Sequence, residues 1–206
     1  MKLKVCGMKY GENIKAVSQL QPDYIGFIFY DQSARYFDGD IPEISESIKK
    51  VGVFVNASMD EIITKINTYQ LQAVQLHGDE SPDLCNALKH QFPQLEIIKV
   101  FSISNHFDFK KLQPYETYVD AFLFDTKGIL PGGNGYTFDW NALEGYPSEK
   151  PFILSGGIGL DEVPQLKTFL KSPLSKHCLA VDINSQFEIE PGLKNVQKLK
   201  EFKSEL

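Results

Sequence analysis

Eight short apolar runs, rich in Val, Ile and Phe, recur along the chain. They span residues 3–6, 24–29, 51–55, 73–76, 96–101, 119–124, 151–154 and 179–183. None of them alternates cleanly between apolar and polar positions. Continuous apolar runs of this length are typical of strands buried on both faces, as in a parallel sheet. The pattern therefore predicts eight buried strands.

Segments with helical periodicity lie between several of these runs. Apolar residues recur every three or four positions in segments 13–20, 59–69, 81–92, 160–170 and 191–202. Two of these segments begin with a capping signal, because Glu61 follows Ser58 by three residues and Pro82 follows Ser81. Cys85 belongs to the apolar stripe of its segment, so we expect it in the core.

The strands and helical segments alternate at a spacing of roughly 20 to 30 residues, which is the rhythm of a (β/α)8 TIM barrel. We predict an α/β fold in which residues 1–206 form a single barrel domain. A doubly wound open sheet is the alternative, but the count of eight strands favours the barrel. The chain is short against the typical ~250 residues of this fold.

Composition and charge exclude several classes of partner. Hydrophobic residues make up 42% and charged residues 23%, as in a soluble globular protein. The net charge of -6 argues against nucleic-acid binding, which relies on a basic surface. No apolar run approaches the ~18 residues that span a membrane, and residues 1–10 lack the apolar core of a secretory signal. We expect a cytoplasmic protein without a membrane partner.

The cysteines and the single arginine stand out in this composition. Cys6, Cys85 and Cys178 are widely and irregularly spaced, which matches no zinc pattern and leaves one thiol unpaired in any disulfide scheme. The chain has twenty lysines but one arginine, Arg35. A guanidinium group offers a carboxylate or phosphate a rigid fork, which lysine does not. Arg35 is therefore a candidate for binding an anionic group.

Polar residues follow the predicted strands where a barrel carries its chemistry, at the carboxyl ends of the strands. They are Cys6 after the first run, Arg35 after the second, Gln75 and His77 at the fourth, Asp125 after the sixth, Ser155, Gly156 and Gly157 after the seventh, and Asp182, Asn184 and Ser185 after the eighth. We expect these side chains to form a ring around one mouth of the barrel.

The stretch "SGGIG" at 155–159 predicts a phosphate site. Glycines let the backbone approach an anion, and the start of the following helix offers unpaired N–H groups. Ser155, Asn184 and Ser185 add polar groups from the same two loops. The alternative is a tight turn that needs glycine for its backbone conformation. The stretch is not the G-x-G-x-x-G pattern, so no nicotinamide or flavin cofactor is expected.

Two further features have both a functional and an ordinary interpretation. The glycine-rich stretch "GILPGGNG" at 128–135 is either a lid that closes over Asp125 or a simple linker. His77 either contacts the substrate or is an ordinary hydrogen-bonded residue. No second histidine or carboxylate stands near it at metal-ligand spacing, so no metal is expected.

Six of these motifs together resemble one family, phosphoribosylanthranilate isomerase. They are "KVCGMK", "SARYF", "VQLHG", "FDTKG...PGGNGYTFDW", "LSGGIG" and "AVDINSQFE", in this order over essentially the whole chain. The family catalyses an Amadori rearrangement in tryptophan biosynthesis. The resemblance implies general acid–base catalysis without a cofactor, because the substrate's own nitrogen carries the positive charge as an iminium.

The resemblance also implies roles for most of the candidate residues. Cys6 would be the general base, Asp125 the general acid, and Arg35 the ligand of the anthranilate carboxylate. The loops 155–157 and 182–185 would hold the phosphate. Apart from the resemblance, the positions of Gln75 and His77 at the fourth run make them candidate substrate contacts. One departure is Gln186, which stands where the family commonly has glycine. It puts in question the backbone freedom on that side of the phosphate site.

Both reacting groups need help from their surroundings. An ordinary thiol with a pKa of ~8.5 is mostly protonated at pH 7, and an ordinary aspartate carboxyl group with a pKa of ~3.9 is ionised. The base must therefore be helped to ionise and the acid to keep its proton, through burial or neighbouring charge. The sequence does not identify the group that activates Cys6.

Other enzymes and one other class of protein remain as alternatives. A ribulose-phosphate epimerase relies on paired aspartates with metal-binding histidines, and a histidine-pathway isomerase has an aspartate in place of Cys6. A sensor of phosphorylated ligands would keep the anion site without turnover. The expected partner is a small phosphorylated molecule, and the expected state is a monomer or homodimer.

Overall fold

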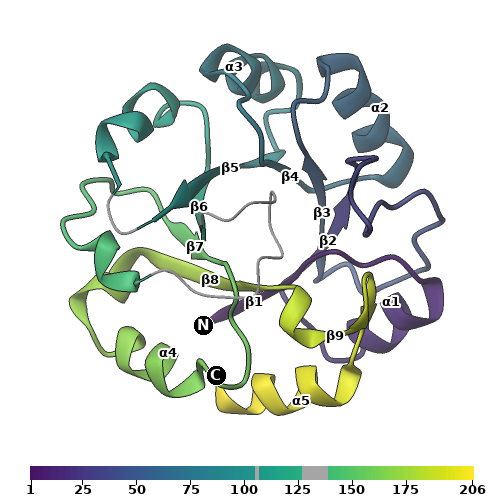
Figure 1. Ribbon diagram of the computed structural model, residues 1–206. Helices are drawn as coiled ribbons and strands as arrows, with labels where there is room; N and C mark the ends of the chain where they lie inside the picture. The colour runs from purple at the N-terminus through teal and green to yellow at the C-terminus, as the bar shows by residue number, and fades with distance from the viewer. Residues whose placement is uncertain (105–106, 127–138) are drawn as a thin grey trace.

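The chain forms a closed barrel of eight parallel strands in the computed structural model, which describes residues 1–104, 107–126 and 139–206. The strands are β1 (Lys2–Val5), β2 (Tyr24–Ile28), β3 (Lys49–Phe54), β4 (Ala73–Leu76), β5 (Glu96–Ile103), β6 (Ala121–Thr126), β7 (Phe152–Leu154) and β8 (Cys178–Ile183). Each pairs with the next, and β1 closes the ring on β8. Figure 1 looks down this ring. The predicted barrel is confirmed, and all eight predicted strands are present.

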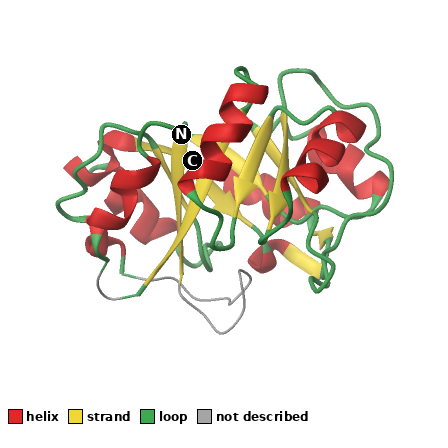
Figure 2. Ribbon diagram, turned by 90° about the horizontal axis from the view of Figure 1, so that it is seen from above, coloured by secondary structure: helices red, strands yellow, loops and turns green. Residues whose placement is uncertain are grey.

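Helices surround the barrel, as Figure 2 shows from the side. They are α1 (Gly11–Ser18), α2 (Met59–Tyr69), α3 (Pro82–Gln91), α4 (Val163–Leu170) and α5 (Val196–Glu205). The predicted caps are present, because the side chains of Ser58 and Ser81 accept hydrogen bonds from the backbone N–H groups of Glu61 and Leu84. Among the described residues, no helix is long and apolar enough to cross a membrane.

Several connections lack the α-helix that a regular alternation would give. No helix joins β2 to β3, a 3-10 helix at Phe109–Tyr115 with Pro114 inside it joins β5 to β6, and the described part of the β6–β7 connection holds a 3-10 helix at Trp140–Leu143. Proline removes a backbone donor and restricts the chain, which disfavours a regular helix. These short connections explain how the barrel closes with 206 residues.

The predicted C-terminal helix over 191–202 begins too early. Residues 188–194 instead form a small antiparallel pair, β9 (Glu188–Glu190) and β10 (Leu193–Lys194), around Gly192 at φ +88°. Helix α5 begins after Asn195, whose side chain accepts from the N–H group of Lys198. The first apolar residues of the predicted stripe therefore belong to the turn and not to the helix.

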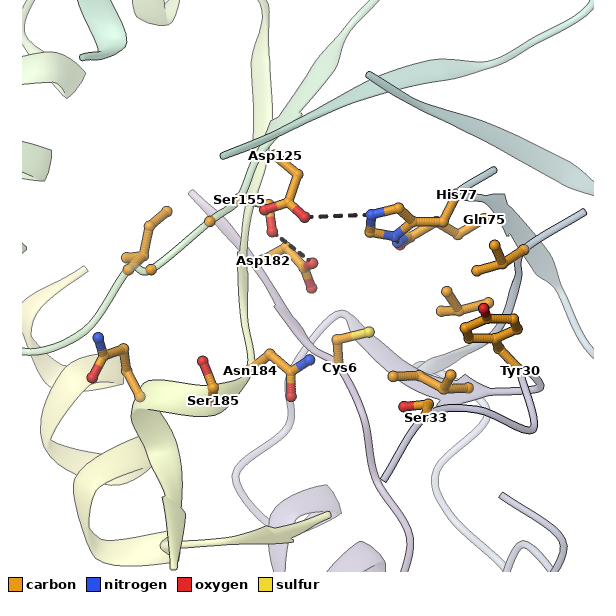
Figure 3. Close-up of a pocket in the computed structure, with 17 residues that line it drawn as sticks. Cys6, Tyr30, Ser33, Gln75, His77, Asp125, Ser155, Asp182, Asn184 and Ser185 are labelled. Carbon is orange, nitrogen blue, oxygen red and sulfur yellow. Dashed lines mark hydrogen bonds and ion pairs between the residues drawn. The ribbon is translucent and has the colours of Figure 1, made fainter. Parts of the chain in front are cut away.

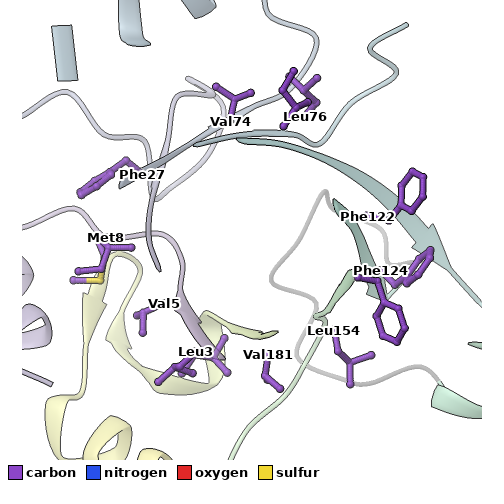
Figure 4. Close-up of a cluster of buried hydrophobic side chains, with 14 of the residues drawn as sticks. Leu3, Val5, Met8, Phe27, Val74, Leu76, Phe122, Phe124, Leu154 and Val181 are labelled. Atoms are coloured by element: carbon purple, nitrogen blue, oxygen red, sulfur yellow. The ribbon is translucent and has the colours of Figure 1, made fainter. Parts of the chain in front are cut away.

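Two layers of buried side chains hold the barrel together. One fills the barrel interior and includes Tyr24, Val51, Ile98, Val100, Leu123 and Ile153. The other lies between the strands and the helices, where Figure 4 shows side chains such as Val5, Val74, Phe122, Leu154 and Val181 pointing outward from the ring. Because side chains alternate along a strand, each apolar run supplies both layers. Cys85 lies in the outer layer, as predicted.

Candidate active site

An open cavity with about 650 Å³ of empty space lies at the carboxyl ends of the strands. Ten of the eleven predicted site residues line it, namely Cys6, Gln75, His77, Asp125, Ser155, Gly156, Gly157, Asp182, Asn184 and Ser185. The predicted ring around one mouth of the barrel is therefore present, with Arg35 outside the lining set.

The turn after β1 brings Cys6 to the cavity wall. Gly7 follows it at φ +73°, a conformation that favours glycine. A Cβ atom on Gly7 would lie 2.7 Å from Asn184 Oδ1 and 2.8 Å from Arg35 Cδ. The glycine therefore lets the side chains of Asn184 and Arg35 close over this turn, next to the thiol.

The neighbouring strand leaves room for the thiol at Gly26. A Cβ atom there would lie 2.8 Å from Cys6 Sγ and 3.2 Å from Cys6 Cα. We expect Gly26→Ala to displace the thiol and to lower kcat by about 100-fold, because a misplacement of about 1 Å has effects of this order. Steady-state kinetics with the folded variant measures the loss. Gly11→Ala is the matched control, since a methyl group there meets nothing within 4 Å, and equal kcat values for the two variants would contradict the prediction.

Asp125 lies at the end of β6, where it meets His77. One carboxylate oxygen accepts from the backbone N–H group of Thr126 at 2.9 Å, and the other lies 3.4 Å from His77 Nε2. The second ring nitrogen, Nδ1, lies 3.1 Å from Gln75 Nε2. Gln75 Oε1 is buried without a hydrogen-bond partner among the described residues. Figure 3 shows His77 and Asp125 facing one another.

A second chain of polar contacts runs from the cavity wall into the barrel interior. Ser155 Oγ donates to Asp182 Oδ2 at 3.0 Å, and Lys4 Nζ lies 2.8 Å from Asp182 Oδ1. Burial alone would lower the pKa of Lys4, but the charges of Asp182 and Cys6 outweigh burial and raise it. Lys4 is therefore a buried ammonium group.

The Cys6 thiol is buried, and burial raises its pKa above the ordinary value. The positive charges of Lys4 and Lys194 oppose this effect, and the negative charge of Asp182 adds to it. This direction is opposite to the help in ionising that we expect from the sequence. A smaller fraction of Cys6 is therefore ionised at neutral pH, although each thiolate is a stronger base than an ordinary one.

Arg35 lies beside the cavity and is held by Glu188. Arg35 Nε and Nη2 contact Glu188 Oε1 and Oε2 at 2.9 Å and 2.7 Å. Burial would raise the pKa of Glu188, but the hydrogen bonds from Arg35 and Lys194 and the charge of Lys194 together lower it. Burial lowers the pKa of Lys194 to about 8, although Glu188 opposes the effect.

The backbone after β7 needs its glycines. Gly156 is at φ +89° and Gly157 at φ +67°. A Cβ atom on Gly156 would also lie 2.2 Å from Thr126 Oγ1. Helix α4 begins at Val163, three residues later than predicted, so loop backbone and not the first helical turn lines the cavity here. The requirement for positive φ is thus present, and it does not by itself distinguish a turn from an anion site.

The departure at Gln186 does not disturb this side of the cavity. Gln186 lies in a 3-10 turn at Ser185–Phe187 and is not among the residues with positive φ. A side chain is therefore compatible with the backbone at this position. The predicted lid at 128–135 lies outside the described residues.

Three charged residues of this region were missed from the sequence, namely Lys4, Glu188 and Lys194. The signal for Lys4 was present, because residues two apart on a strand share a face and Cys6 stands two positions later. Glu188 and Lys194 gave no such signal, since the contact of Glu188 with Arg35 joins residues 153 positions apart.

A closed (β/α)8 barrel with a thiol, carboxylates and an imidazole at the carboxyl ends of its strands defines the class of barrel enzymes. The family model of N-(5'phosphoribosyl)anthranilate (PRA) isomerase matches residues 3–205. The chain therefore belongs to the phosphoribosylanthranilate isomerase family, as the resemblance predicted.

Individual relatives agree with this assignment. The N-(5'-phosphoribosyl)anthranilate isomerase of Parabacteroides distasonis is 43% identical over 98% of this chain and 91% of its own length. That of Phocaeicola vulgatus is 42% identical over 95% and 92%. The crystal structure of the Thermotoga maritima enzyme has a TM-score of 0.83 at 29% identity, covering 100% of this chain and 98% of that one.

One similar structure is a complex. A phosphoribosyl anthranilate isomerase with reduced 1-(o-carboxyphenylamino)-1-deoxyribulose 5-phosphate has a TM-score of 0.80 at 28% identity. The alignment covers 98% of this chain and 96% of that one. The chain is thus an isomerase by family, and its cavity lies where barrel enzymes act.

Proposed function

We propose that this chain converts phosphoribosylanthranilate to 1-(2-carboxyphenylamino)-1-deoxyribulose 5-phosphate, with Cys6 as general base and Asp125 as general acid. The observation that carries the proposal is that both side chains line one cavity, from strands β1 and β6. Strands β7 and β8 stand between them around the barrel. A sugar anchored at the β7 and β8 loops would lie between acid and base (Figure 3).

The two groups divide the proton transfers of the Amadori rearrangement. Asp125 gives its proton to the ring oxygen, the C1–O bond breaks, and the nitrogen lone pair forms an iminium at C1. The Cys6 thiolate then takes the proton from C2, and the electron pair of that C–H bond neutralises the iminium to give an enolamine. The enolamine tautomerises to the ketone, so no electrons enter or leave and no cofactor is needed.

The phosphate is assigned to the loops after β7 and β8. Gly156 and Gly157 expose backbone at the cavity wall, and Ser155, Asn184 and Ser185 add polar groups beside it. The ligand of the similar enzyme complex carries a 5-phosphate, which supports a phosphorylated ligand for this cavity.

Arg35 is assigned to the anthranilate carboxylate. Glu188 occupies the edge of the guanidinium formed by Nε and Nη2. Nη1 has no hydrogen-bond partner among the described residues, which leaves the other edge for a second carboxylate. Glu188 thus orients the fork before the substrate arrives.

Gln75 and His77 are assigned to holding the acid as well as to contacting the substrate. His77 Nε2 faces the carboxyl group of Asp125, and Gln75 faces the opposite ring nitrogen. A hydrogen bond at one ring nitrogen decides which nitrogen carries the proton. Gln75 therefore influences whether the His77 Nε2 atom that faces Asp125 is a hydrogen-bond donor or an acceptor.

The decisive experiment is to mix wild-type protein with phosphoribosylanthranilate and to follow the loss of anthranilate fluorescence. We expect multiple turnovers without added metal or cofactor, and competitive inhibition by the reduced product analogue. A sensor of phosphorylated ligands would bind the analogue in a titration but leave the substrate unchanged, and that outcome would exclude the proposed function. Cytoplasmic location and a monomeric or homodimeric state stay predictions.

A further inference from the structure

Lys4 is a lysine enclosed in the barrel interior directly below the cavity. Its side chain has 0% exposure. Lys4 and Cys6 are two positions apart at the end of β1, so they share the face that points into the barrel. Burying a charged group costs free energy unless polar partners compensate it. A lysine at this buried position therefore needs a structural or functional explanation.

The Lys4 ammonium pairs with a carboxylate and also acts electrostatically on the thiol. Its Nζ donates to Asp182 Oδ1 at 2.8 Å, and its positive charge acts on the Cys6 side chain, which lies two positions further along the same face of the strand. Asp182 is in turn held by Ser155 Oγ at 3.0 Å. An ammonium group has three donors, and Asp182 accepts from Lys4 at Oδ1, so the pairing with the carboxylate does not use up the capacity of Lys4 to stabilise a thiolate.

A purely structural ion pair looks different in this barrel. Lys99 and Glu80 form one, with side-chain exposures of 2% and 1%, and Lys99 also donates to the backbone oxygens of Leu76 and Gly78. Lys99 and its partners fix the loop after β4. Lys4 differs because it shares its face of the strand with the thiol proposed as the base.

We propose that Lys4 is a positioning residue for the base: its ammonium group is the counter-ion that stabilises the Cys6 thiolate, and Asp182 controls how much of that charge acts on the sulfur. The inference rests on the proposed role of Cys6 as general base. It supplies the activating group that the sequence left unidentified.

The other charged groups around the sulfur are weaker partners. Lys194 adds a smaller positive influence on Cys6, and Asp182 adds a negative one. Asp125 and His77 face the same cavity from β6 and β4. Removing Lys4 therefore leaves Asp182 as the charge that acts most strongly on Cys6, and removing the charge of Asp182 leaves Lys4 in that place.

The test is the rate at which iodoacetamide alkylates Cys6, measured against pH by mass spectrometry of the Cys6 peptide. In Lys4→Met we expect alkylation at pH 7 to be about tenfold slower or more, with the midpoint of the rate–pH curve moved upward, because an opposite charge has been removed. In Asp182→Asn we expect faster alkylation and a lower midpoint. The midpoint reports ionisation and is not moved by a merely steric change.

Lys4→Met and Asp182→Asn are expected to move the midpoint of Cys6 alkylation in opposite directions. Either variant alone therefore tests the inference if the other fails to fold. Lys99→Met is the matched control, because it removes a buried, ion-paired lysine away from Cys6, and it should leave the Cys6 midpoint unchanged. Midpoints that do not move in Lys4→Met and Asp182→Asn would overturn the inference. The alkylation needs no substrate, so a wild-type protein without isomerase turnover would overturn the proposed function separately.

Discussion

Cys6→Ser and Asp125→Asn are each expected to lower kcat by about 10²–10⁴-fold, the usual contribution of a positioned acid or base. Serine ionises far less readily than cysteine, so Cys6→Ser removes the base with little change in volume. Asparagine keeps the shape of Asp125 but has no proton to give to the ring oxygen. Binding should survive, because neither change alters the β7 and β8 loops assigned to the phosphate.

The measurement is the rate of anthranilate fluorescence loss, together with the affinity for the reduced product analogue. Cys178→Ser is the control for the first change, because Cys178 lies at the start of β8 and does not line the cavity. Asp120→Asn is the control for the second, since Asp120 pairs with Lys89 just before β6. A kcat for Cys6→Ser or Asp125→Asn within about tenfold of wild type would exclude the assigned role.

Arg35→Lys is expected to raise KM by about 10- to 100-fold, and Arg35→Ala at least as much. Hydrogen bonds to charged groups contribute about 1.5–3 kcal/mol each. Lysine keeps the charge but not the planar fork, and it cannot reproduce the two contacts with Glu188 while a second edge binds the substrate. The loss should lie mostly in KM, because Arg35 is assigned to binding and not to proton transfer.

A substrate without the carboxylate provides the control. Phosphoribosylaniline lacks the group assigned to Arg35, so wild type and Arg35→Lys should handle it alike. A wild-type KM for phosphoribosylanthranilate in Arg35→Lys would contradict the bidentate assignment. A loss of the same size with phosphoribosylaniline would show that Arg35 acts on the fold of the turn at Gly7, which its Cδ atom approaches.

Patterns among neighbouring residues predicted those strands and helix ends whose formation depends on neighbouring residues. The apolar runs became strands because burial on both faces leaves no polar side to expose. Helix α3 begins where Ser81 and Pro82 indicated, because capping depends on a few neighbouring residues. The helix predicted over 191–202 failed at its start, because the β9–β10 turn of Glu188 to Lys194 is stabilised by contacts with distant residues such as Arg35 and Asn13.

The sequence by itself determined the eight-strand barrel and placed the candidate site residues at its carboxyl end, because strand burial and the parallel order of the chain follow from the spacing of apolar residues. The tertiary structure alone decided how charge is distributed around them. Lys4 meets Asp182 across 178 positions of sequence, and Arg35 meets Glu188 across 153. The first pair forms because barrel closure brings β8 beside β1, and the second because the β9 segment lies beside the loop that follows β2. No periodicity along the chain encodes either contact.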